Sequence, residues 1–407
     1  FAARSPSTLG QQSPDLASFL RLLEERHPRL QADAARIRAS EARIAPTQAL
    51  PDPQVRLSYT NDGVQDITFG DSMDANLTLS YEQEVPRRGK RRLSGTVASA
   101  EVDVARSELD LDRRALREQV ILAYLDVLRA DRTHGIVEAS REVLRTLLAS
   151  ARARYEAGQG VLEDLLKTQT EITRIEVEVA TLDQERAEAA ARLNAAVGRP
   201  PGTPIPALTH VPTLAMPDGQ EAMAATASSP VLERMRRMEA VSAARLESAK
   251  LAAKPDWMWG ASWAERGSLD PMVMGMVGAR LPLWRKSKQL QEAAAAEGDL
   301  AAARAAREAE GLSTSGEVAE LLARAQGAQR RLDLLEQALI PQARSTLEAG
   351  SASYANGRSV FISLLDDAID LLQFERDRER QRAELGAALA GIEARTSLQL
   401  VDGGIEP

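Results

Sequence analysis

Residues 154–166 read RYEAGQGVLEDLL, and residues 353–365 read SYANGRSVFISLL. Both stretches have the form Tyr-x-x-Gly followed by an apolar run, and the pairs Tyr155/Tyr354 and Gly158/Gly357 share one offset. Self-similarity at a fixed offset indicates a chain built from two copies of one unit. In each copy, the pattern predicts a long helix that ends at a glycine turn and an amphipathic helix that returns.

Further landmarks recur in the same order on both sides of the turns. His27-Pro28 and Ser229-Pro230 each open an alanine-rich helical stretch, which closes at a proline-containing segment. Two segments of alternating polarity follow, and then Pro86 or Pro282 precedes a long helical run. The unit is therefore helix, strand, strand, long helix, glycine turn and long helix. It occurs over roughly 1–200 and again over roughly 225–397.

The predicted fold class is mainly α with a small β part, built from two repeats of a long helical hairpin. The segments are an extended N-terminus over 1–14, helices within 15–50, 86–198, 228–254 and 283–397, strands within 52–84 and 255–282, an inter-repeat linker over 199–227 and a tail over 398–407.

Composition agrees with long helices, because 27% of the residues are charged and only 3% are aromatic. The net charge of −8 disfavours nucleic acid as a partner. The absence of cysteine fits an oxidising envelope compartment without disulfides. No run approaches the length of a transmembrane helix, and no signal peptide precedes Phe1, so we interpret the chain as a mature or trimmed form.

Apolar and polar residues alternate along two segments of the first copy, which predicts strands. Residues 54–60 place Val55, Leu57 and Tyr59 on one face, and residues 74–82 place Ala75, Leu77, Leu79 and Tyr81 on one face. In the second copy Trp257, Trp259 and Trp263 share a face, as an interfacial aromatic girdle would. The alternation fits either a half-buried sheet in a soluble protein or strands with lipid on one side and a water-filled lumen on the other.

Four strands cannot enclose an aqueous channel, and open strand edges are not tolerated in lipid. If the strands cross a membrane, several chains must therefore contribute to one closed sheet. Three copies would supply twelve strands, which is enough to surround water. Oligomerisation thus follows from the membrane interpretation.

The helix after Gly158 carries a heptad series of Leu165, Ile172, Val179 and Leu193, which is interrupted at Arg186. A heptad repeat indicates left-handed supercoiling against neighbouring helices. A soluble coiled-coil hairpin would show the same repeat, but it leaves the strands and their tryptophans unexplained.

The order of elements, the Tyr-x-x-Gly turns and the run PRRGKRR at 86–92 resemble the TolC family of outer-membrane efflux proteins, over nearly the whole chain. The resemblance implies a homotrimer with a twelve-stranded β-barrel in the bacterial outer membrane and a helical tunnel that extends into the periplasm. A periplasmic adaptor (membrane fusion) protein and an inner-membrane RND-type pump would dock at the turns. Residues 83–92 look most like the heavy-metal CusC and CzcC branch. Many members carry an N-terminal lipidated cysteine. Because this sequence contains no cysteine, we expect that anchor to be absent or removed here.

The same resemblance assigns candidate sites. The docking turns are Tyr155, Gly158, Tyr354 and Gly357, and the membrane interface is Trp257, Trp259, Trp263, Tyr59 and Tyr81. Family members ring the tunnel mouth with two aspartates, whose positions are occupied here by Ser363 and Asp366. Three copies of Asp366 would form a negative constriction that attracts cations. Asp367 and Asp370 belong either to this periplasmic gate or to a solvated helix surface.

Other motifs give little chemistry. The basic residues at 87–92 fit a periplasmic barrel rim better than a nucleic-acid site. Met272, Met274 and Met276 are soft donors for Cu(I), but packing is the favoured interpretation. We expect no metal site, no cofactor and no catalytic residue. The predicted function is a passive outer-membrane exit duct for heavy-metal cations. The alternatives are the same duct for drugs or type I protein secretion, and a soluble coiled-coil scaffold.

Overall fold

The computed structural model describes residues 14–64, 67–69, 72–356, 358 and 360–402. The chain divides into two compact units. We call the described residues of 1–31, 110–231 and 311–407 the hairpin unit, and those of 32–109 and 232–310 the sheet unit. Two long helices, α3 (Lys90–Glu156) and α7 (Gln289–Leu334), contribute residues to both units.

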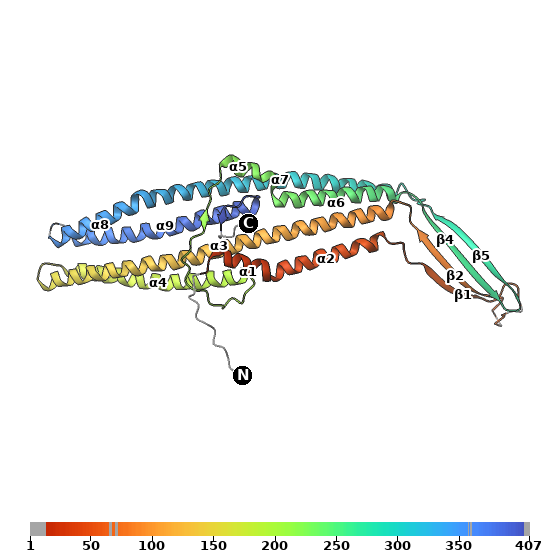
Figure 1. Ribbon diagram of the computed structural model, residues 1–407, viewed down its shortest axis with the longest axis horizontal. Helices are drawn as coiled ribbons and strands as arrows, with labels where there is room; N and C mark the ends of the chain where they lie inside the picture. Colours follow the sequence, from red (N-terminus) through yellow and green to blue (C-terminus); the bar gives the residue numbers. More distant parts are fainter. Residues whose placement is uncertain (1–13, 65–66, 70–71, 357, 359, 403–407) are drawn as a thin grey trace, which may run out of the picture. The chain divides into compact units, whose positions relative to one another are not determined.

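The predicted repeat is present in the order of elements (Figure 1). The first copy contains α1 (Leu16–Arg26), α2 (Pro28–Gln48), β1 (Gln54–Thr60), β2 (Asn76–Val85), α3 and α4 (Leu162–Ala196). The second contains α6 (Pro230–Ala252), β4 (Asp256–Arg266), β5 (Leu269–Arg280), α7, the π-helical segment η2 (Leu335–Leu339), α8 (Ile340–Ala355) and α9 (Phe361–Arg395). Between the copies lie β3 (Thr213–Leu214), α5 (Gly219–Ala225) and the 3₁₀ turn η1 (Thr226–Ser228), and β6 (Val401–Asp402) follows the second copy.

The sheet unit holds an antiparallel sheet in the order β1-β2-β4-β5, so the two copies meet at β2 and β4. One cross-strand row consists of Leu57, Leu79, Trp263 and Val273, which are all exposed. The adjacent row consists of Arg56, Ser80, Ser262 and Met274. Because successive strand residues point to opposite sides, the sheet has an apolar face and a more polar face. The predicted alternation is thus carried across all four strands.

Two details of the strands differ from the sequence prediction. β2 begins at Asn76 and not at residue 74, and it continues to Val85. Ala75 is fully buried and does not extend the apolar face. The sequence left open which face the β5 methionines share, and the structure places Met272 and Met274 opposite Ala264 and Ser262, on the more polar face.

One apolar core cluster of the hairpin unit is formed where α3, α4 and α9 pack together. It includes Ile175 and Leu182 from α4, and Leu364 and Leu365 from α9. Arg186, which interrupts the heptad, donates to Asp131 at 2.5 Å and to the carbonyl of Ile205 at 3.0 Å. Arg186 therefore binds the linker through polar contacts, at a heptad position whose counterparts in the series are apolar.

Two segments predicted as linker and tail contain structure. β3 in the linker pairs antiparallel with β6 in the tail. Buried Glu393 on α9 accepts the N–H groups of Leu400 and Val401, both at 3.0 Å, and fixes the tail beside the helix. In the described ranges, no helix combines the length and the apolar character needed to cross a membrane.

Candidate functional site

The first candidate site is the pair of turns that closes the two helical hairpins. Gly158, at the predicted glycine turn, has φ of +70°, and glycine adopts this conformation without steric cost. The N–H of Gln159 donates to the carbonyl of Arg154 at 2.9 Å. The second turn repeats this bond, from the N–H of Arg358 to the carbonyl of Ser353 at 2.9 Å. Gly357 lies outside the described residues.

The two motif tyrosines lie in different environments. Tyr155 is 43% exposed, whereas Tyr354 is 7% exposed. The ring of Tyr354 packs edge-on against Phe361, with 5.4 Å between ring centroids. The Arg154 guanidinium lies over the same ring, 4.3 Å from its centroid, and makes a cation–π contact between the turns. Tyr155 thus presents a surface to solvent, while Tyr354 joins one turn to the other.

The predicted gate residues lie on the first turns of α9. Ser363, Asp366 and Asp370 are exposed, and Asp367 is half-buried. Burial, followed by the nearby carboxylates of Asp370 and Asp366, raises the pKa of Asp367. Asp367 therefore binds a proton at a higher pH than an ordinary aspartate does.

The facing end of α4 carries Glu163, Asp164 and Lys167. Lys167 donates to Glu163 at 2.7 Å, which raises the pKa of Lys167, and Asp366 adds to this effect. Burial and the neighbouring Glu163 raise the pKa of Asp164. A groove between α4 and α9, which we call the tip groove, is lined by both Lys167 and Asp366. The lining of the groove holds three carboxylates, Glu163, Glu171 and Asp366, and two cations, Lys167 and Arg174, so its formal charge is negative by one.

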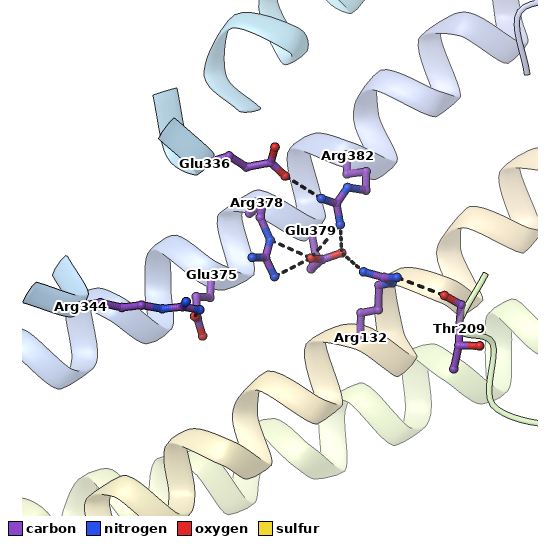
Figure 2. Close-up of polar contacts among 8 residues, drawn as sticks. All are labelled: Arg132, Thr209, Glu336, Arg344, Glu375, Arg378, Glu379 and Arg382. Atoms are coloured by element: carbon purple, nitrogen blue, oxygen red, sulfur yellow. Dashed lines mark hydrogen bonds and ion pairs between the residues drawn. The ribbon is translucent and has the colours of Figure 1, made fainter. Parts of the chain in front are cut away.

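A second candidate site, absent from the sequence prediction, is centred on Glu379 of α9 (Figure 2). This carboxylate is only 2% exposed. Arg378 donates to it at 2.9 Å and Arg382 at 3.1 Å, while an Arg132 nitrogen lies 4.0 Å away. A buried carboxylate requires such partners, because desolvation strongly disfavours an isolated charge.

The arginines around Glu379 lead to two other parts of the hairpin unit, and a neighbouring ion pair on α9 reaches a third. Arg382 also pairs with Glu336 of η2 at 2.6 Å. Arg132 on α3 also donates to the carbonyl of Thr209 in the linker at 3.1 Å. One turn earlier on α9, Glu375 pairs with Arg344 of α8 at 2.5 Å (Figure 2). We call Glu379, Arg378, Arg382, Arg132 and Glu336 the charge hub, which joins the second hairpin to the first and to the linker.

The third candidate site is the apolar face of the sheet. Its predicted aromatic residues are all surface-accessible, with Trp257 58% and Tyr59 44% exposed. Trp257 lies at the start of β4 opposite Val85, and Tyr59 lies near the end of β1 opposite Leu77, so the two residues are at opposite ends of the strands. The rings of Tyr81 and Trp259 pack 5.4 Å apart. Aromatic residues at both strand ends are typical of the two interfaces of a membrane.

No group of three or more His, Asp or Glu side chains with metal-site geometry occurs in the part of the chain that the structure describes. The methionines at 272, 274 and 276 are exposed along β5. The side chains of the sheet therefore form an exposed surface, whereas the two charged candidate sites, the tip groove and the charge hub, lie on the helices.

Residues 19–199 match the outer membrane efflux protein family. The curated protein CyaE of Bordetella pertussis is 32% identical over 166 residues, which are 39% of this chain and 34% of CyaE. The match thus spans about a third of that relative's length.

Several solved structures share the fold. The outer membrane protein VceC of Vibrio cholerae superposes with a TM-score of 0.77 at 18% identity, over 93% of this chain and 95% of VceC. CusC gives a TM-score of 0.80 at 14% identity, over 93% and 91% of the two chains. The open-state MtrE channel of Neisseria gonorrhoeae gives 0.73 at 17% identity, over 95% and 91%.

These findings confirm the mainly helical, TolC-like channel fold predicted from the sequence. They also confirm the predicted localisation, in the outer membrane with an extension into the periplasm. CusC and VceC are similar to the chain to a comparable degree, so the fold does not single out the heavy-metal branch. The matched family is one of efflux channels and not of enzymes.

Proposed function

We propose that the chain is a passive outer-membrane exit duct of a tripartite efflux system and works as a homotrimer. The observation that carries the proposal is the four-stranded sheet, with one apolar exposed face and two open edges, β1 and β5. Lipid accepts such a sheet only when its edges are closed. If β5 of each subunit pairs with β1 of the next, three chains form a closed barrel of twelve strands.

Assembly is the direct test of this proposal. We expect the purified chain to require detergent and to sediment as a trimer, because an open sheet exposes unpaired backbone groups along both edges. Analytical ultracentrifugation in matched-density detergent measures the protein mass. A stable monomer in detergent-free buffer would instead support the soluble coiled-coil scaffold.

The closed ends of the hairpins are the proposed docking region for a periplasmic adaptor and an RND-type pump. Two features support this assignment. Exposed Tyr155 stands beside Gly158, and the tip groove lies between the first turns of α4 and α9. Buried Tyr354 acts indirectly here, because it holds the two turns together through Arg154 and Phe361.

The tip is also the proposed gate, and heavy-metal cations are the proposed cargo. Asp366 is exposed near the closed end of the second hairpin, and a threefold ring of this carboxylate would concentrate cations. Transport of drugs or of a secreted protein through the same duct is the alternative. In that case the carboxylates would regulate opening and would not select the cargo.

Asp366→Asn is expected to weaken cation selectivity and block by trivalent cations in planar-bilayer recordings. One carboxylate attracts a unit charge 4 Å away by about 1 kcal/mol in water, so losing three should raise the blocking concentration at least about tenfold. Glu348→Gln, at an exposed position on α8, is the matched control. Unchanged selectivity and block in Asp366→Asn would place this residue on the solvated surface and not in the gate.

A further inference from the structure

The turn between β5 and α7 exposes an unusual amount of apolar surface. Leu281 is 58% exposed, Leu283 is 78% exposed and Trp284 is 76% exposed. The turn is internally ordered, because the N–H groups of Ser287 and Lys288 both donate to the carbonyl of Trp284, at 3.2 and 3.0 Å. The apolar side chains are therefore presented on a defined backbone.

Basic residues follow these apolar ones directly. Arg285, Lys286 and Lys288 are all exposed. Within the described part of the chain, none of the three takes part in an ion pair. The turn, which we call the 281–288 turn, thus combines a tryptophan, two leucines and three uncompensated positive charges in eight positions.

The corresponding turn of the first copy is built differently. Arg87 and Arg88 occupy the positions that match Leu283 and Trp284. Lys90, which matches Lys286, bonds to Asp256 at 2.7 Å and to the carbonyl of Lys254 at 2.8 Å. The first copy therefore neutralises its matching lysine within the protein, whereas the second leaves this charge available to a partner.

The position of the 281–288 turn indicates what that partner is. The alternation along β5 places Val273, Val277 and Ala279 on the apolar face, and Leu281 continues the same series. The turn also joins the sheet to α7, so it lies at the helical, periplasmic end of the strands. Tryptophan beside lysine and arginine is typical of the headgroup region, where cations contact lipid phosphates.

We propose that the 281–288 turn binds anionic phospholipid headgroups in the periplasmic leaflet of the outer membrane. Leu283 and Trp284 enter the boundary between headgroups and acyl chains, while Arg285, Lys286 and Lys288 contact the phosphates. This inference rests on the proposed function, because it requires the sheet to lie in lipid.

The test uses the whole protein in phosphatidylcholine vesicles that contain spin-labelled phosphatidylglycerol or spin-labelled phosphatidylcholine. Electron paramagnetic resonance then measures the relative association of the two lipids with the protein. We expect the wild type to prefer phosphatidylglycerol, with a preference that declines as salt is added. The variant Arg285→Gln/Lys286→Gln/Lys288→Gln should lose at least about threefold of this preference.

A control with the same change in net charge is available on α1 and α2. Arg21, Arg26 and Arg38 are exposed, and Arg21→Gln/Arg26→Gln/Arg38→Gln should retain the wild-type preference. Equal loss in the control would overturn the proposal, because net charge alone would then explain the effect. Wild-type preference in the 285/286/288 variant would overturn it as well.

Two further outcomes separate this inference from its premise. If the wild type shows no motionally restricted lipid at all, membrane insertion fails, and the proposed function fails with it. If restricted lipid is present without preference for phosphatidylglycerol, only the lipid-binding turn is disproved. Weaker trimers in Trp284→Ala, with unchanged lipid preference, would assign the turn to a neighbouring subunit and also overturn the proposal.

Discussion

Glu379→Ala is expected to destabilise the hairpin unit by about 3–5 kcal/mol, the usual cost of breaking a buried ion pair by removing one partner. The substitution leaves Arg378, Arg382 and Arg132 facing one another without the carboxylate between them. Their mutual repulsion adds to the loss of the hydrogen bonds. Chemical unfolding of the purified protein in detergent, followed by helical circular dichroism, measures the change.

Glu320→Ala is the matched control on α7. Glu320 pairs with Arg324 on the same helix, but both side chains are mostly exposed, at 63% and 62%. Exposed pairs of this kind contribute less than about 1 kcal/mol. If Glu379→Ala were no more harmful than Glu320→Ala, the charge hub would be a surface feature without a structural role.

Loss of the charge hub is expected to affect the tip of the hairpins as well. α9 carries Glu379 near its middle and Asp366 in its first turns, so one rigid helix links the two sites. Arg132 in turn ties the carboxylate to α3, the outgoing helix of the other hairpin. We therefore expect loss of Glu379 to loosen the register between the hairpins as well as to lower stability.

The sequence shows why the charge hub could not be predicted from it. Residues 375–382 read ERDRERQR, which has the appearance of a solvated helix with alternating charges. Glu375 at 16% side-chain exposure and Glu379 at 2% differ only through what packs against them. Burial of a charge depends on α3 and the linker, which are distant in sequence. The density of arginine in residues 375–382 was the one available signal.

The turns show the same limit on a smaller scale. The repeated Tyr-x-x-Gly motif and the positive φ of Gly158 follow from local chemistry and were predictable. The burial of Tyr354 was not, because it depends on its contacts with Phe361 and Arg154. The first copy has Leu162 at the place of Phe361, and the second has Ser353 at the place of Arg154. Two identical motifs therefore acquired different environments.

The sheet was predictable in its faces but not in its order. A period of two along each strand specifies which residues share a side. It does not specify that β2 pairs with β4, which brings Leu79 of the first copy beside Trp263 of the second. That pairing makes the apolar face continuous across both copies. If this face lies in lipid, a charged residue that interrupts it should be strongly unfavourable.

Ala261→Arg is accordingly expected to prevent assembly of the proposed trimer in the outer membrane. Ala261 is the central residue of β4 and lies on the apolar face, between Tyr81 and Gly275. An arginine facing lipid at mid-depth costs about 2–4 kcal/mol in each chain, and a trimer contains three copies. The amount of folded trimer in isolated outer membranes, resolved by unheated gel electrophoresis, measures the effect.

Ser262→Arg is the matched control, one residue further along the same strand. Ser262 points to the opposite face, where its cross-strand neighbours are Ser80 and Met274. If that face lines a water-filled lumen, the guanidinium remains hydrated and trimers should form at nearly the wild-type level. Equal tolerance of both variants would show that lipid does not cover the apolar face. If Ser262→Arg were the more harmful variant, the lipid-facing and lumen-facing sides of the sheet would have to be assigned the other way round. The comparison is direct, because the added charge and the strand are the same in both variants and only the side of the sheet differs.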